Sequence, residues 1–165
     1  MEIKWTPWRM AYIKGTKEEG CPLCRAAAEP DRPESLVVYR ARFCYALLNL
    51  YPYNNGHLMI APYAHLGDLA GLDTETAAEM MALAQRSVRA LRRAMNPHGF
   101  NIGINLGKVA GAGIADHVHM HVVPRWQGDN NFMAVVSGTK MIPELLEETC
   151  ALLRQAFQEE EGPPA

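Results

Sequence analysis

The sequence predicts an α+β fold built on an antiparallel sheet. Strand-like segments lie on both sides of one long helical segment, and a second helical segment follows the last of them. The order strand, strand, strand, helix, strand, strand, helix is typical of α+β domains. The connections between consecutive strands are short, which favours antiparallel pairing because parallel strands need long crossovers.

The strands are predicted from short runs of β-branched, aromatic and other apolar residues bounded by turn residues. We expect them at residues 36–39, 43–48, 57–61, 99–105 and 118–123, and a short edge strand could form at 132–136. Residues 51–56 predict a turn, and Pro62 and Pro124 end their strands. In residues 99–105 the apolar side chains alternate with Asn101, Gly103 and Asn105, so the two sets should lie on opposite faces.

Residues 74–95 predict the clearest helix. Asp73 or Thr74 can cap its first turn, and Asn96-Pro97 ends it. Apolar residues at helical spacing predict the buried stripe, which comprises Ala77, Met80, Met81, Ala84, Val88, Leu91 and Met95. The polar face is expected to be solvated and carries Arg86, Arg89, Arg92 and Arg93. A short helix is expected at residues 23–28. A C-terminal helix should run from Pro143, in its first turn, to about Phe157.

The length of 165 residues suits a single domain spanning residues 1–165. Residues 1–35 are irregular, and the acidic, Pro-rich residues 158–165 are expected to fray. The formal net charge of −2 argues against a general nucleic-acid binder. Because the sequence shows neither a membrane-spanning run nor a signal-peptide pattern, we expect a cytoplasmic protein without a membrane partner.

Four cysteines divide into two kinds. Cys44 and Cys150 stand alone in apolar surroundings and are expected to be inert core residues. Cys21 and Cys24 form a C-x-x-C pair, which suits either a buried turn or a metal site. Cytoplasmic thiols stay reduced, so we expect no disulfide.

Three of the six histidines, His117, His119 and His121, occupy alternate positions. On a strand such residues share one face, so the three imidazoles should emerge together while Val118 and Met120 point into a core. Packing alone explains this row poorly, because buried polar groups need partners.

Two chemistries could use such a row. The imidazoles could bind zinc. Alternatively, one neutral imidazole could attack phosphorus to form a phosphoramidate, and a second could protonate the departing oxygen. The small residues at 107–113, directly before the row, would let backbone N–H groups approach an anion, which favours phosphate chemistry.

The segment His117-Val118-His119-Met120-His121-Val122-Val123 resembles the signature of the histidine triad family of nucleotide hydrolases and transferases. Residues 43–49 and 56–62, followed by His65, resemble the first half of that family. Residues 124–133 and 139–144 are similar to the branch that contains diadenosine tetraphosphate phosphorylases. The resemblance covers roughly residues 21–126 and implies a five-stranded antiparallel sheet with two main helices.

The resemblance implies an enzyme that cleaves dinucleoside polyphosphates. In such an enzyme, His119 would carry AMP as a covalent intermediate, and His121 would contact the phosphate and the leaving oxygen. His57 would lie beside the triad and support it. Asn49 would bind the ribose hydroxyls and Asn105 would contact the phosphate region. The adenine would lie against apolar residues of the first strands.

A homodimer with joined sheets is also implied, with Trp126 and the C-terminal segment near the partner's site. In some members of the family a zinc ion is bound by residues that correspond here to Cys21, Cys24, His65 and His117. Two sulfurs and two nitrogens would make a closed, structural site rather than a catalytic one. No organic cofactor is expected.

The sequence departs from the family at one point. Many family hydrolases carry Gln or Ser four or three residues before the first triad histidine, where this sequence has Gly113 and Ile114. The missing polar group argues against simple hydrolysis, and Gly113 leaves room for an acceptor larger than water, such as orthophosphate. The charge of orthophosphate could be offset by Lys108, Arg125 or Lys140, although each could equally be a surface cation.

Other functions stay open. Water could be the acceptor, on dinucleoside polyphosphates or on AMP–amine conjugates. The triad could ligate a catalytic zinc ion, or the chain could be a nucleotide-binding sensor without turnover. His98 lies in a turn and is expected to be an exposed bystander.

Overall fold

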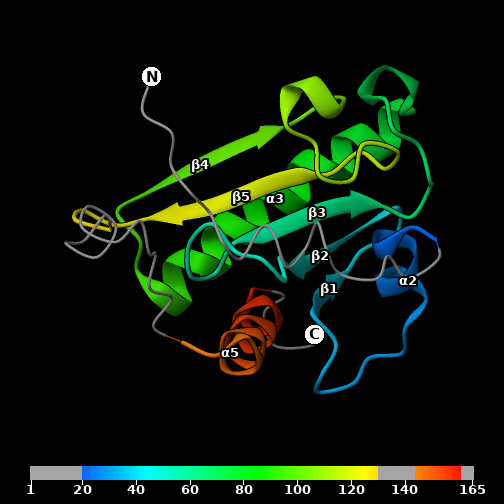
Figure 1. The fold of residues 1–165 in the computed structure, drawn as a ribbon. Coiled ribbons are helices and arrows are strands. Elements are labelled where there is room, and N and C mark those ends of the chain that lie inside the picture. The colour runs from blue at the N-terminus through cyan, green and yellow to red at the C-terminus, as the bar shows by residue number, and fades with distance from the viewer. Residues whose placement is uncertain (1–19, 130–143, 161–165) are drawn as a thin grey trace.

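Five strands form one sheet in the order β1-β2-β3-β5-β4, and every neighbouring pair is antiparallel (Figure 1). The computed structural model describes residues 20–129 and 144–160. The elements are α2 (Pro22–Ala28), β1 (Val37–Arg40), β2 (Cys44–Leu48), β3 (Leu58–Pro62), η1 (Leu69–Gly71), α3 (Thr74–Met95), β4 (Gly99–Ile104), η2 (Lys108–Ala110), β5 (Met120–Arg125) and α5 (Leu146–Glu159). The predicted α+β class, with five antiparallel strands and two main helices, is confirmed.

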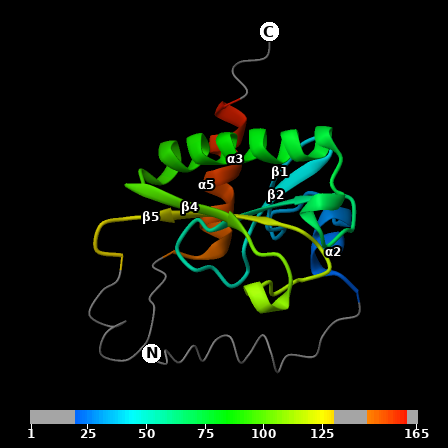
Figure 2. The same cartoon turned by 90° about the horizontal axis from the view of Figure 1, so that it is seen from above.

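The two long helices and the short helix α2 lie on opposite faces of the sheet. Helices α3 and α5 pack on one face, over a core that includes Met120, Val122 and Phe157 (Figure 2). A smaller apolar cluster on the other face joins α2 to β1, β2 and β3, and there the hydroxyl of Tyr45 donates to the carbonyl oxygen of Leu23 at 2.7 Å. This second face carries the histidines described below.

Helix α3 has the predicted bounds, but its buried face differs from the predicted stripe. Asp73 caps the first turn by accepting the N–H of Thr76 at 2.8 Å, and Asn96 ends the helix in the left-handed conformation. Ala77 and Met81 are exposed, contrary to the prediction. The buried residues are Thr76, Met80, Leu83, Ala84, Ser87, Ala90 and Leu91. The stripe is shifted because α3 packs against α5 as well as against the sheet.

The sequence predicted that Arg86 lies on a solvated face, and the structure contradicts this prediction. Its guanidinium lies 4.0 Å from the centre of the Tyr39 ring and donates to the carbonyl oxygen of Phe157 at 2.8 Å. Arg89 forms an ion pair with Glu160 at 2.7 Å. Because α3 holds the end of α5 in this way, α5 continues to Glu159, and the prediction of fraying from residue 158 is wrong for its first residues.

The start of α5 also differs from the prediction. The helix begins at Leu146, three residues later than predicted, and Pro143 itself lies outside the described residues. The carboxylate of Glu144 accepts hydrogen bonds from the side chains of Thr149 and Asn55, which holds this residue outside the helix. The predicted edge strand at 132–136 lies outside the described residues.

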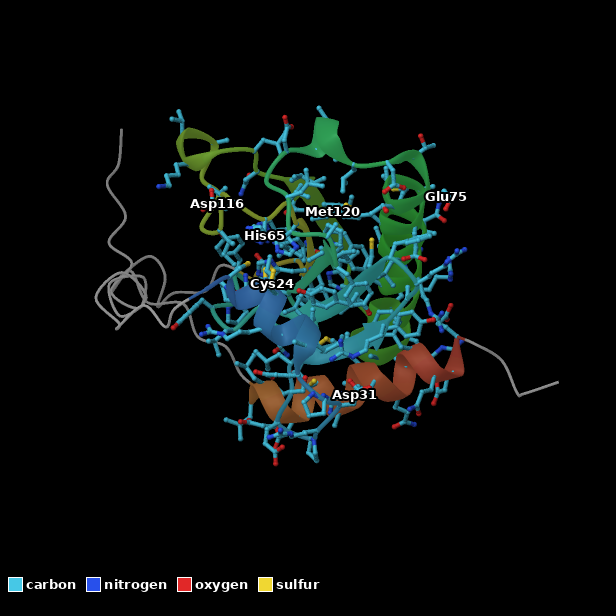
Figure 3. The ribbon with its side chains drawn as sticks, turned by 90° about the vertical axis from the view of Figure 1, so that its right-hand side faces the viewer. Cys24, Asp31, His65, Glu75, Asp116 and Met120 are labelled. Carbon is cyan, nitrogen blue, oxygen red and sulfur yellow. The ribbon has the colours of Figure 1, made fainter. Side chains whose placement is uncertain are left out.

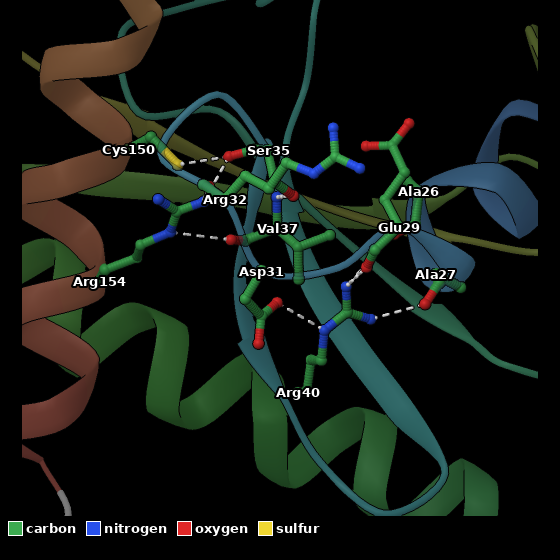
Figure 4. A network of polar contacts seen from close by, with 10 residues as sticks. All are labelled: Ala26, Ala27, Glu29, Asp31, Arg32, Ser35, Val37, Arg40, Cys150 and Arg154. Carbon is green, nitrogen blue, oxygen red and sulfur yellow. Dashed lines mark hydrogen bonds and ion pairs between the residues drawn. The ribbon is translucent and has the colours of Figure 1, made fainter.

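The two edges of the sheet differ in how far other elements cover them. Arg154 on α5 donates to the carbonyl oxygen of Val37 on β1 at 3.1 Å, and Arg40 on β1 donates to Ala27 at the end of α2 at 2.8 Å (Figure 4). Both helices therefore cover the β1 edge. On β4, at the opposite edge, residues 101–103 are exposed and Ile102 exposes 48% of its surface. None of the described helices is long and apolar enough to cross a membrane.

Candidate active site

The three alternating histidines do not all lie within a strand. Strand β5 begins at Met120 and continues through Pro124 to Arg125, so only His121 lies in the ladder and the predicted range is shifted. Before it, the N–H of Val118 donates to the carbonyl oxygen of Leu66 at 2.7 Å instead of pairing with β3. The intervening apolar residues Val118, Met120 and Val122 are buried as predicted, so the alternation persists beyond the strand.

The environment of His119 selects one tautomer. Its side chain is 3% exposed, and its Nδ1 lies 2.8 Å from the carbonyl oxygen of His117. A carbonyl oxygen only accepts, so Nδ1 carries the proton. The lone pair is then on Nε2. The ring of His121 lies beside it, with the two ring centres 4.9 Å apart.

His57 selects the tautomer of His121 in the same manner. The backbone N–H of Tyr53 donates to His57 Nδ1 at 3.0 Å, so the proton of this buried imidazole is on Nε2. That Nε2 lies 2.9 Å from His121 Nδ1 and donates to it. His121 therefore carries its own proton on Nε2. A lone pair on His119 and an N–H on His121 thus occur side by side.

Burial lowers the pKa of His121 to about 4, and the charge of neighbouring His119 acts in the same direction. At neutral pH His121 is consequently an uncharged hydrogen-bond donor. It can stabilise a departing oxygen through a hydrogen bond, but it does not hold a spare proton to give away.

Tyr53 is a residue that sequence reasoning missed. Its ring stacks on His57, with ring centres 4.8 Å apart, and lies 5.9 Å from that of His121, while half of the side chain stays exposed. Residues 51–56 were interpreted only as a turn. The nearby Gly-His pair is the one local signal that this turn supports a site.

Asn54 and Asp129 were missed as well. Asn54 is buried and donates to the carbonyl oxygen of Pro124 and to the Asp129 carboxylate, both at 2.9 Å. Arg125 pairs with the same carboxylate at 2.6 Å and holds the pKa of Asp129 down at about 2. The turn that carries Tyr53 is therefore fixed to the end of β5. The contact joins residues 75 positions apart, which no local pattern reveals.

The other predicted nucleotide-binding residues lie on several elements, and Asn49 is the one with a described contact to a site histidine. Asn49 follows β2, and its side-chain nitrogen lies 3.4 Å from His57 Nδ1. Asn105 follows β4 and is half-buried, and Gly113 is exposed in the loop before the triad. Trp126 follows β5, and its backbone N–H donates to Asp129. It lies five residues beyond His121, or roughly 16 Å along an extended chain.

The three predicted anion-binding cations differ in their surroundings. Arg125 is engaged by Asp129 and also donates to Asn101 at 2.8 Å, so its charge is already compensated. Lys108 is exposed on η2, in the loop before the triad. Lys140 lies outside the described residues. His98 is exposed as expected, but it accepts the backbone N–H of Gln127 at 2.9 Å and therefore supports the turn after β5.

Cys21, Cys24, His65 and His117 come together although they are distant in the chain. One potential ligand atom from each lies within 4.8 Å of all the others. Figure 3 shows Cys24, on α2, beside His65, and their Sγ and Nδ1 atoms are 3.3 Å apart. His117 Nδ1 lies 3.4 Å from Cys21 Sγ and 3.5 Å from Cys24 Sγ.

These distances suit a tetrahedral metal ion. With metal–sulfur and metal–nitrogen bonds of about 2.3 and 2.1 Å, a tetrahedron separates S and N by about 3.6 Å. His117 Nε2 lies 2.9 Å from the carbonyl oxygen of Pro62, which places the proton there and leaves Nδ1 free to bind. The cluster uses His117, so His119 and His121 do not share a metal site with it.

The comparisons with known proteins agree with this fold. A family model described as the HIT domain matches residues 31–128. The chain belongs to the HIT family and is an enzyme of that family.

Two relatives and two solved structures illustrate the similarity. The AP-4-A phosphorylase of Mycobacterium tuberculosis is 45% identical over 159 residues, covering 90% of this chain and 80% of that protein. Protein hit of Bacillus subtilis is 31% identical, covering 71% and 79%. A zinc-bound histidine triad family protein from Mycobacterium smegmatis is 32% identical, with a TM-score of 0.69, covering 86% and 95%. A histidine triad nucleotide-binding protein from Sulfolobus tokodaii shares the fold at 24% identity, with a TM-score of 0.70 and coverage of 86% and 94%.

Proposed function

We propose that the chain cleaves dinucleoside polyphosphates such as diadenosine tetraphosphate through a covalent AMP–His119 intermediate, with orthophosphate as the acceptor. The observation that carries this proposal is the hydrogen-bond sequence from Tyr53 through His57 to His121. It presents an N–H on His121 beside the lone pair of His119. The similarity to a protein named AP-4-A phosphorylase supports the choice of substrate.

In the first step the His119 Nε2 lone pair attacks the phosphorus of an AMP unit. A P–N bond forms, the bond to the bridging oxygen breaks, and its electron pair leaves with that oxygen as ATP. His121 Nε2–H stabilises the departing oxygen. The imidazole attached to phosphorus becomes more positive, and the carbonyl oxygen of His117, 2.8 Å from Nδ1, stabilises that charge.

The low pKa of His121 bears on the choice among substrates. A polyphosphate leaving group is weakly basic, since the second pKa of a phosphate ester is about 6, so a hydrogen bond suffices for it to depart. An amine must gain a proton as it leaves. The neutral state of His121 therefore favours dinucleoside polyphosphates over AMP–amine conjugates.

In the second step an acceptor attacks phosphorus and releases His119. Orthophosphate would give ADP. Gly113 is exposed and adds no side chain to the loop before the triad. Of the two predicted cations that the structure describes, Lys108 is exposed in this loop, whereas Arg125 is paired with Asp129. In this proposal Asn49 binds the ribose hydroxyls, and Asn105 binds the phosphate.

Zinc is proposed as a structural ion held by Cys21, Cys24, His65 and His117. The donor set, the spacing and the hydrogen bond from His117 to Pro62 all support it. When bound, the ion would join α2 to the loop after β3 and to the start of the triad. It would add no reactive ligand, since all four positions are filled by protein atoms.

A homodimer is proposed through the exposed β4 edge. An unpaired edge strand is a template for pairing with a second strand, and the opposite edge is covered by α2 and α5. Trp126 is proposed to lie near the partner's site in this assembly.

The test is product analysis of diadenosine tetraphosphate incubated with the enzyme, with and without orthophosphate. ADP plus ATP formed only with phosphate would support the full proposal. AMP plus ATP in both mixtures would replace the acceptor by water and leave the cleavage intact. No turnover in either mixture would refute the proposed function.

A further inference from the structure

One row of paired residues runs across the whole sheet at the level of His121. The register pairs Val37 with Leu47, Leu47 with Met59, Met59 with His121, and His121 with Gly103. Directly paired residues of neighbouring antiparallel strands share a face. The row therefore passes from three apolar side chains, through the histidine, to a residue without a side chain.

Gly103 is not explained by the fold. Glycine inside a strand is unfavourable because it packs nothing, and it commonly marks a place that a ligand or another backbone approaches closely. The backbone of Gly103 does not have the positive φ that requires glycine. A Cβ atom built there would meet nothing within 4 Å. The described residues would thus accept a side chain at this position.

The order of the strands relates this space to the reaction. Neighbouring strands are about 4.8 Å apart, so Met59 and Gly103 lie one strand spacing to either side of His121. In an in-line displacement the nucleophile and the leaving oxygen lie on opposite sides of phosphorus. If the adenosine of the transferred AMP is held over the first strands, from Asn49 to Met59, that side of His121 is occupied, and the space without side chains over Gly103 is the side left for the leaving nucleotide.

We infer that Gly103 is a specificity-determining residue. Its missing side chain opens the path by which the leaving half of a dinucleoside polyphosphate crosses β4. Asn101 on β4 and Asn105 directly after it lie two residues to either side of Gly103, so the alternation places them on its face, where their side-chain N–H groups could bind the phosphate chain. This inference rests on the proposed function and adds the position of the leaving group to it.

The experiment compares two substrates in three variants. Diadenosine tetraphosphate has a nucleotide leaving group, whereas adenosine 5′-phosphorofluoridate loses only fluoride. The variants are Gly103→Ala, Gly103→Val and the matched control Gly99→Val. Gly99 is on the same strand and the same face, about 13 Å away, and a Cβ atom there also meets nothing within 4 Å. Valine favours strands, so the sheet should tolerate each change.

For Gly103→Val we expect kcat/KM on diadenosine tetraphosphate to fall about 10- to 100-fold, the range that misplacement of a substrate produces, with little change on the fluoridate. Gly103→Ala should give a smaller selective loss, and Gly99→Val should change neither substrate. Equal losses on both substrates, or no loss, would overturn the inference. Equal losses accompanied by dissociation in sedimentation analysis would assign Gly103 to contact with a second copy. Failure of the unmodified enzyme on both substrates would instead refute the proposed function.

Discussion

Replacing His57 by phenylalanine should separate the hydrogen bonds of this residue from its packing. His57 is fully buried, accepts the Tyr53 N–H at 3.0 Å and donates to His121 at 2.9 Å. Phenylalanine keeps an aromatic ring against Tyr53, whose ring centre lies 4.8 Å away. It removes these two hydrogen bonds and the 3.4 Å contact of the Asn49 side-chain nitrogen with His57 Nδ1, so His121 is no longer restricted to the tautomer with Nε2–H.

The magnitudes follow from these two hydrogen bonds. An intramolecular hydrogen bond contributes a net free energy of about 1 kcal/mol, which corresponds to about five-fold in rate if it is lost from the reactive tautomer of His121. The Tyr53 N–H becomes unsatisfied at a partly buried position, which should lower the free energy of unfolding by about 1 to 3 kcal/mol. His57→Gln retains an N–H donor that can reach His121, so its kcat should recover to within about twofold of the parent.

The assay is steady-state turnover of diadenosine tetraphosphate, with denaturant unfolding measured in parallel. His57→Phe should lower kcat more than it raises KM, because the residues proposed to bind the nucleotide are retained and only the 3.4 Å contact of Asn49 with His57 is lost among them. An unaltered kcat in His57→Phe, in a protein shown to be folded, would refute the idea that His57 fixes the tautomer of His121 and thereby supports turnover. A His57→Gln enzyme as slow as His57→Phe would show that the imidazole acts in some other way.

Three further outcomes are expected. His119→Ala should abolish turnover, because no other described imidazole replaces its lone pair, yet should still bind AMP in calorimetry; residual turnover above about 1% of the parent rate would assign the nucleophile elsewhere. Cys21→Ala should lose bound zinc in elemental analysis and melt at a lower temperature, with His119→Ala as a metal-retaining control; equal zinc content in both would remove the proposed site. The pKa of His121, about 4, lies below the value of an unfolded histidine, so the unfolded chain binds this proton more readily and stability falls as the pH drops from about 6.5 to 4. His121→Asn should flatten this part of the curve of melting temperature against pH, and an unchanged slope would contradict the low pKa.

Local pattern was sufficient for most of the fold. Helix α3 has the predicted bounds because a capping Asp73 and a left-handed Asn96 are local signals. The alternation around the histidines was also correct, since a period of two depends only on an extended chain. The buried stripe of α3, the start of α5 and the start of β5 were misplaced, because each depends on which neighbouring element the segment meets.

The sequence by itself determined the chemical inventory of this protein. Three alternating imidazoles, a C-x-x-C pair and two further histidines can be recognised without coordinates, because ligand and nucleophile chemistry depends on residue type and local spacing. The grouping of Cys21 and Cys24 with His65 and His117 came from resemblance to the family, and the structure then brought those four residues together.

Only the tertiary structure decided the proton positions and the surroundings of the reacting atoms. The tautomer of His121 depends on His57, which is 64 residues away, and that of His57 depends on a backbone N–H in a turn. The space without a side chain at Gly103, beside His121, follows from the register between β4 and β5. Hydrogen bonds and empty space of this kind arise between segments distant in the chain, so they exist only after the sheet has formed.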